Sequence, residues 1–90
     1  MISIYKATFD EDWPKYFDRL DDETKERVSK KIKKILEFPE KRHLKGNAKF
    51  FIDEIGQNRI TYRIFKENEE ARFYFVGNHK EYEKWYRQFF

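Results

Sequence analysis

The sequence predicts an α+β domain in which a small twisted antiparallel sheet packs on an N-terminal helical hairpin, in the element order βααβββα. Two observations lead to this prediction. Apolar residues recur at helical spacing in two early segments, and three later runs are rich in aromatic and β-branched residues. Because 90 residues suffice for one core but not for two lobes, residues 1–90 are expected to form a single domain.

The first half of the chain predicts a short strand and then two amphipathic helices. Ile2 to Ala7 alternate as expected for a strand at or next to a sheet edge. Asp10 or Asp12 can cap the first helix, whose apolar stripe is Trp13, Tyr16, Phe17 and Leu20. Acidic residues begin the second helix at 21–23 and Phe38-Pro39 ends it; its stripe is Val28, Ile32, Ile35 and Leu36.

The second half predicts three strands and a final helix. The runs 48–55, 58–65 and 71–77 are separated by segments of hairpin length, which favours an antiparallel meander. Asn78 and Glu81 have the spacing of a capping box at the start of the last helix. The apolar stripe of that helix is Tyr82, Trp85, Tyr86 and Phe89.

The middle strand of this meander carries arginines among core-type residues. Strand alternation puts Ile60, Tyr62 and Ile64 on one face, and Arg59, Thr61, Arg63 and Phe65 on the other. Since the helices can cover only one face of such a sheet, the face with the arginines is expected to be open.

Composition excludes several classes of site. There is no cysteine, and therefore no disulfide, thiolate zinc site or cysteine nucleophile; no metal or cofactor is expected. No apolar run approaches the ~18 residues of a membrane span and no leader is evident, so a cytoplasmic location with no membrane partner is expected.

Charge is distributed unevenly along the chain. The net charge is only +3, but residues 1–23 hold three basic and seven acidic side chains, whereas residues 24–37 hold six basic and two acidic ones. This polarity suggests an anionic partner for the middle of the chain. The lysine run itself is better explained as the solvated face of a helix: Lys30, Lys31, Lys33 and Lys34.

Three segments resemble the RelE/ParE superfamily of toxins from bacterial and archaeal toxin–antitoxin modules. These are "HLKG", "GQNRITYRIF" with its Gly56-x-x-Arg59-aliphatic-x-Tyr62 pattern, and "FYFVGNHKEYEKWY", whose His79-x-x-Tyr82 is similar to the ending of HigB-like members. The order and spacing of the three motifs together carry the resemblance.

The resemblance implies a toxin that cleaves messenger RNA on the translating ribosome, with an antitoxin protein as partner and a possible toxin–antitoxin heterotetramer. It leaves two alternatives open. One is a ParE-like inhibitor of DNA gyrase, and the other is a degenerate member that binds its antitoxin without catalysis. The family constrains the fold more tightly than the function.

By this resemblance Arg59 is the phosphate-binding arginine, since a guanidinium fork suits phosphate oxygens. The alternative is an ion pair with Asp53 or Glu54. Arg63, on the same face, could bind a second phosphate or pair with an acid across the strands. Glu54 could accept a proton or simply be the partner of Arg59.

The remaining candidates lie around the last helix and the polar loop before the meander. His79 could be an acid or base, or an exposed helix-end residue, with Lys80 beside it as a substitute charge. Tyr82 and Tyr86 could contact a base or phosphate, although both belong to the apolar stripe and core packing is favoured for Tyr86. RelE-like lysines before the glycine turn are absent, because Ile52 and Glu54 stand there; Lys45 and Lys49 could supply charge, and His43 is a weak candidate.

Overall fold

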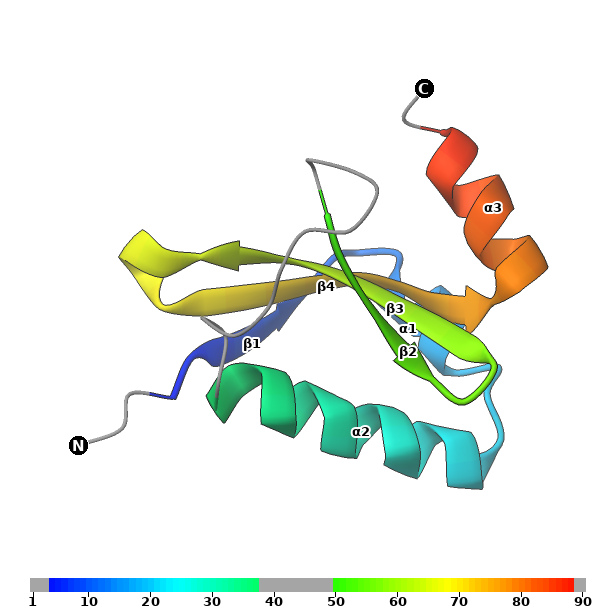
Figure 1. The fold of residues 1–90 in the computed structure, drawn as a ribbon, viewed down its shortest axis with the longest axis horizontal. Coiled ribbons are helices and arrows are strands. Elements are labelled where there is room, and N and C mark those ends of the chain that lie inside the picture. Colours follow the sequence, from blue (N-terminus) through cyan, green and yellow to red (C-terminus); the bar gives the residue numbers. More distant parts are fainter. Residues whose placement is uncertain (1–3, 38–49, 89–90) are drawn as a thin grey trace.

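The computed structural model describes residues 4–37 and 50–88 and confirms the α+β prediction. A four-stranded sheet lies between helix α2 on one side and helix α3 on the other (Figure 1). The elements in chain order are β1 (Lys6–Phe9), α1 (Trp13–Phe17), α2 (Asp22–Glu37), β2 (Phe51–Ile55), β3 (Asn58–Phe65), the 3₁₀ turn η2 (Lys66–Asn68), β4 (Glu70–Asn78) and α3 (His79–Arg87).

The sheet has the strand order β1-β4-β3-β2 and is mixed rather than wholly antiparallel. Strands β2, β3 and β4 form the predicted antiparallel meander, but β1 pairs with β4 in parallel, with Lys6 opposite Glu70 and Phe9 opposite Phe73. A parallel pair needs a long crossover, which α1, α2, β2 and β3 supply between these two strands. The first strand also begins later than predicted, at Lys6, and Ile2 and Ser3 lie outside the described residues.

Two features shape the meander. The turn between β2 and β3 begins at Gly56, whose φ of 59° is readily adopted only by glycine. Between β3 and β4 the register shifts: Thr61 lies opposite Phe75, but Tyr62 lies opposite Phe73, so Tyr74 is an extra residue in a β-bulge.

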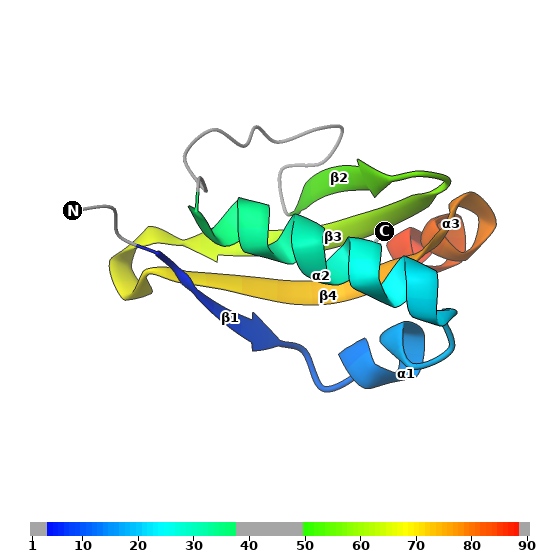
Figure 2. The ribbon, with the colours of Figure 1, turned by 90° about the horizontal axis from the view of Figure 1, so that it is seen from below.

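We call the sheet face that packs on α2 the hairpin face. Its core joins Val28 and Ile35 of α2 to Ile60, Tyr62 and Phe73 of the sheet. The predicted helical stripe is therefore confirmed, and α2 crosses this face in front of the strands in the view of Figure 2.

The helical hairpin differs from prediction at its first member. Helix α1 ends at Phe17 instead of including Leu20, and Asp12 occupies its N-cap without a side-chain hydrogen bond. Helix α2 starts as predicted, because the Asp21 carboxylate accepts a hydrogen bond from the Thr24 N–H at 2.8 Å. It ends at Glu37, and Phe38-Pro39 lies outside the described residues.

We call the opposite face, which carries Arg59, Thr61 and Arg63, the arginine face. The expectation that helices leave this face open is only half right. Helix α3 covers one end of it, where Tyr82 and Trp85 pack with Phe50 and Phe75 in a second core. The burial of Thr61 is complete, at 0% exposure. The cause is the capping box at Asn78, which turns the chain directly from β4 into a helix that folds back over the sheet.

Candidate functional site

Arg59 lies on the arginine face at the edge of the area covered by α3. Its guanidinium carbon is 5.0 Å from the centroid of the Tyr82 ring, a cation–π contact, and its side chain is half-buried. In the described ranges no carboxylate forms an ion pair with Arg59. Asp53 instead accepts a hydrogen bond from the Tyr62 hydroxyl at 2.9 Å, and Glu54, directly opposite Arg59 in the register, is exposed. The arginine is thus held by a ring and keeps its donors for another group.

Arg63 occupies a second position on the same face. Its guanidinium carbon lies 5.0 Å from the Phe50 ring centroid and 5.9 Å from that of Tyr74. Tyr74 lies on this face two residues after Arg72, and the β-bulge places Phe75 on the same side although the two are adjacent in sequence. Both arginines of β3 therefore rest on aromatic rings.

Tyr82 is only 8% exposed, and its ring packs against the Arg59 guanidinium. Burial raises the pKa of the Tyr82 hydroxyl, the neighbouring Tyr86 raises it further, and Arg59 opposes both. Tyr82 is consequently neutral near pH 7 and can donate a hydrogen bond but cannot serve as a base. Tyr86 is half-buried with its ring centroid 5.6 Å from that of Tyr82, in keeping with the packing role favoured for it.

The two other predicted residues of α3, His79 and Lys80, are exposed on the surface of the helix. The His79 Nε2 lies 3.1 Å from a Glu83 carboxylate oxygen one turn along the helix, and both side chains are exposed. Among the described contacts His79 meets neither Arg59 nor Glu54. Lys80 is exposed at the start of the same helix. The structure thus brings together Arg59, Glu54 and Tyr82, and leaves His79 on the helix surface.

The start of α3 is anchored by Glu81. One carboxylate oxygen accepts the Asn78 N–H at 2.9 Å, and the other forms an ion pair with Arg19 at 2.8 Å, which ties α3 to the segment after α1. Gly77 is required here, because a Cβ at this position would lie 2.8 Å from the Phe75 ring and 2.9 Å from Glu81. The adjacent Tyr82 is thereby fixed over Arg59.

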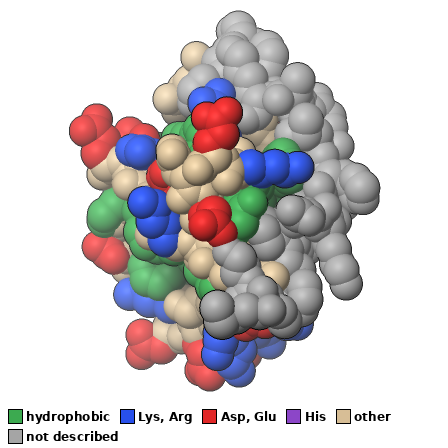
Figure 3. All heavy atoms as spheres, turned by 90° about the vertical axis from the view of Figure 1, so that its left-hand side faces the viewer, with side chains coloured by type: hydrophobic (Ala, Val, Ile, Leu, Met, Phe, Trp, Pro, Cys, Tyr) green, Lys and Arg blue, Asp and Glu red, His purple; other side chains and the backbone are tan. Residues whose placement is uncertain are grey.

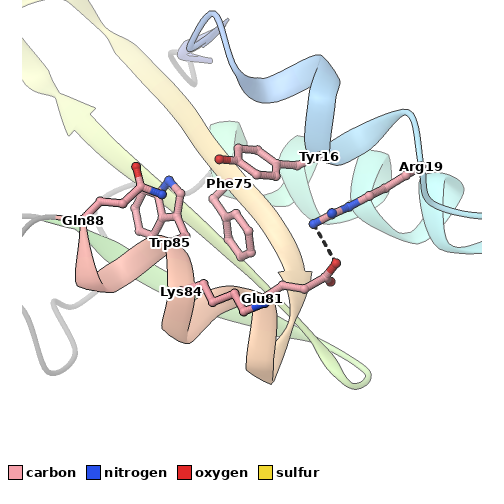
Figure 4. Close-up of a pocket in the computed structure, with 7 residues that line it drawn as sticks. All are labelled: Tyr16, Arg19, Phe75, Glu81, Lys84, Trp85 and Gln88. Carbon is pink, nitrogen blue, oxygen red and sulfur yellow. Dashed lines mark ion pairs between the residues drawn. The ribbon is translucent and has the colours of Figure 1, made fainter.

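A hollow of about 220 Å³ lies between α1 and α3, next to the Arg19–Glu81 ion pair (Figure 4). Its floor is Phe75 and Trp85, and its rim carries Tyr16, Lys84 and Gln88. Because the floor rings are 1% and 6% exposed, the hollow offers little surface to a ligand. We regard it as a packing seam.

At the end of the molecule that bears the β3–β4 turn, acidic and basic side chains are interspersed (Figure 3). The described residues contain no group of three or more His, Cys, Asp or Glu side chains able to hold a metal ion. None of the helices within the described ranges is long and apolar enough to cross a membrane. Lys45, Lys49 and His43 lie outside the described residues.

Sequence reasoning missed three residues of this surface: Phe50, Arg72 and Tyr74. Arg72 lies directly opposite Arg63 in the register. The β-bulge lies beyond this pair, between Thr61 and Tyr62, so the register of Arg72 is set by the β3–β4 turn alone. Strand alternation within β4 alone, with Ala71 and Phe73 buried on either side of it, was the available signal for placing Arg72 on the arginine face.

Neither family models nor curated proteins match this chain. Solved structures do match it. A chain of the Escherichia coli RelBE toxin–antitoxin complex is 26% identical, with a TM-score of 0.72, covering 82% of this chain and 95% of that one.

Two further matches extend over most of both chains. The isolated E. coli RelE toxin is 22% identical with a TM-score of 0.72, covering 96% of this chain and 99% of that one. A chain of the RelBE2 complex from Mycobacterium tuberculosis is 17% identical with a TM-score of 0.74, covering 88% and 95%. At such identities these two show the fold alone. The comparisons show that the chain has a RelE-like fold, that of the RelE toxin and of chains in RelBE toxin–antitoxin complexes.

Proposed function

We propose that the chain is the toxin of a toxin–antitoxin module and that it inhibits translation as a metal-independent endoribonuclease acting on messenger RNA at the ribosome. The observation that carries the proposal is Arg59: it is half-buried on the Tyr82 ring, and no described carboxylate neutralises it. A guanidinium that is held on a ring and has no carboxylate partner is suited to bind phosphate oxygens. The RelE-like fold supplies the context.

Cleavage without a metal requires the ribose 2′-hydroxyl to attack the neighbouring phosphorus. The 5′-oxygen then leaves, and a cyclic phosphate forms. Arg59 would stabilise the charge that builds on the phosphoryl oxygens. Glu54, exposed and opposite Arg59 in the register, would accept the 2′-hydroxyl proton. The neutral Tyr82 hydroxyl would donate to a phosphate oxygen, and His79, once released from Glu83, would protonate the leaving oxygen.

The RNA contacts proposed outside the reacting group are Lys45, Lys49, Arg63, Lys80 and Tyr86. We further propose that an antitoxin protein binds the chain in the cytoplasm and covers the arginine face with acidic side chains. Support comes from the neighbours, several of which were solved as RelB–RelE toxin–antitoxin complexes, including the one from Pyrococcus horikoshii, 14% identical with a TM-score of 0.66 over 83% of this chain and 94% of that one. A toxin–antitoxin heterotetramer is the assembly we expect.

Transcript mapping by primer extension after brief induction tests the proposal. The wild type should produce cuts confined to translated regions, and Arg59→Ala should lower their rate by about 10²–10³ fold, as expected on loss of a donor to a developing oxyanion. The matched control is Arg27→Ala on α2, an exposed arginine paired with Glu23 at 3.0 Å, which should leave cleavage unchanged. Intact transcripts during growth arrest by the wild type would refute the nuclease.

One observation favours a second function, that of a toxin without nuclease activity. His79 pairs with Glu83 and meets neither Arg59 nor Glu54 among the described contacts, and Tyr82 is buried, so the proposed acid is not assembled with Arg59. In that case the arginine face would serve only to bind a partner, either DNA gyrase or the antitoxin. DNA damage or stalled replication with intact transcripts would indicate gyrase, and no effect on growth would indicate a chain that only binds its antitoxin.

A further inference from the structure

Arg63 and Arg72 are directly opposed across β3 and β4. Both lie on the arginine face, because their neighbours Tyr62, Ala71 and Phe73 belong to the core of the hairpin face. Like charges directly opposite in a sheet are destabilising. An anion between two guanidinium groups would remove this repulsion, so the pair is a place where binding of a negative group is favoured.

Acidic side chains of the protein do not fulfil this role for Arg72. In the part of the chain that the structure describes, Arg72 forms no ion pair. Glu70 is the acidic residue two positions earlier on the same face of β4, and its carboxylate accepts a hydrogen bond from the Thr8 hydroxyl. The acidic residue of β4 nearest to Arg72 is therefore hydrogen-bonded to β1 instead.

Aromatic rings lie beside the arginine pair. Tyr74 is half-buried, and its ring centroid is 5.3 Å from that of Phe50, which Arg63 also contacts. A ring next to a pair of guanidinium groups matches a nucleotide, because the phosphate requires positive donors and the base requires a stacking surface. An acidic peptide would use the arginines but would not need the ring.

We propose that Arg63, Arg72 and Tyr74 form a second nucleotide subsite, in which the two arginines bind one phosphate of a single-stranded RNA and Tyr74 stacks on an adjacent base. The inference rests on the proposed function and deepens it. Arg59 and Arg63 are four residues apart on β3, or roughly 13 Å along an extended strand. One guanidinium cannot serve both places, so the two sites bind different phosphates of one RNA strand, which runs along β3.

The test is binding of non-cleavable RNA to the folded chain. A 2′-O-methyl hexauridylate can span both sites, whereas the corresponding dinucleotide carries a single internucleotide phosphate and cannot. By fluorescence anisotropy at low salt we expect the hexanucleotide to bind more tightly than the dinucleotide. Tyr74→Leu should weaken hexanucleotide binding by roughly 5- to 150-fold, the range that corresponds to loss of base stacking.

Arg72→Gln should weaken hexanucleotide binding and lower the salt dependence by about one phosphate contact. The matched control, Arg27→Gln, removes the same charge from α2 and should leave both quantities unchanged. Arg72→Gln should also raise Tm at low salt, because it removes one of two opposed charges. This second readout shows that the variant is folded.

The outcomes separate the two proposals. Equal affinities for the two RNA lengths, or hexanucleotide binding that Arg72→Gln and Tyr74→Leu leave intact, would overturn the second subsite and spare the proposed nuclease. If Arg72→Gln weakens an acidic peptide but not RNA, the subsite is a protein contact and the inference is also wrong. If Arg59→Ala abolishes transcript cleavage while the second subsite fails, only this inference falls.

Discussion

The two faces of the sheet use aromatic residues differently. On the hairpin face, Tyr62 and Phe73 are 1% and 0% exposed and fill a core against α2. On the arginine face, Tyr82, Phe50 and Tyr74 carry guanidinium groups on their rings. One face derives its stability from buried apolar surface, and the other holds charge at a boundary between core and solvent.

This difference explains how a chain of 90 residues can place arginines in a central strand. A cation over a ring loses some water but gains attraction to the ring face, and its N–H donors remain directed outward. An arginine beneath α2 would instead need a buried carboxylate. The arginine face can therefore change its charges without disturbing the hairpin face, and the following predictions test that independence.

The largest expected effect is on the hairpin face. Ile35→Ala removes a side chain with 0% exposure and should lower the free energy of unfolding by about 2–5 kcal/mol. Urea denaturation followed by circular dichroism measures this. Ile4→Ala is the control, since Ile4 is 64% exposed and its loss should cost less than about 0.5 kcal/mol. A loss of similar size for both variants would mean that α2 contributes little to the core.

Next in size is the anchor of α3. Asn78→Ala removes the side chain that accepts the Glu81 N–H at 2.9 Å and should cost about 0.5–2 kcal/mol. Hydrogen exchange should speed up in α3 while the amides of α2 stay protected, because the two helices lie on opposite faces. Lys80→Ala, an exposed change in the same helix, is the control. Equal deprotection of α2 would show that the faces unfold together.

A smaller effect is expected for the contact between Arg59 and Tyr82. A double-mutant cycle of Arg59→Ala and Tyr82→Leu should give a coupling of about 0.5–1 kcal/mol in the free energy of unfolding. Tyr82→Phe keeps the ring and should keep most of the coupling with Arg59. Additive single changes would contradict the idea that this ring holds the guanidinium in place.

The smallest effect concerns alkaline pH. The pKa of Tyr82 is raised in the fold, mainly by burial, so the neutral hydroxyl is favoured over the ionised one. The pKa shift therefore stabilises the fold fully below the ordinary tyrosine pKa of about 10. This contribution is lost as the pH rises through the pKa that Tyr82 has in the folded protein. Between pH 9 and 11, roughly the range around that ordinary pKa, the free energy of unfolding should therefore fall less for Tyr82→Phe than for the wild type. Urea titrations at each pH measure this. Parallel curves for the two proteins would contradict it.

Much of the site followed from local rules. Alternation along 58–65 placed Arg59 and Arg63 on one face, and the Asn78–Glu81 spacing predicted the capping box that the structure contains. The alternative of an ion pair to Asp53 or Glu54 was also compatible with the sequence. Only the tertiary structure decided against it: Asp53 lies opposite Ile60 on the hairpin face and accepts a hydrogen bond from the Tyr62 hydroxyl. Whether Arg59, Glu54, His79 and Tyr82 act in catalysis stays a prediction.

The sequence by itself determined the elements with local causes: the apolar stripe of α2, the glycine turn at Gly56, the three meander strands and the cap of α3. Tertiary structure decided the parallel pairing of β1 with β4, the bulge at Tyr74, the cover of α3 over one end of the arginine face, and the meeting of Arg63 with Arg72. The physical reason is that helix periodicity and turn geometry depend on neighbours along the chain. Strand direction, register and the burial of a face depend on partners distant in sequence, so no local pattern encodes them.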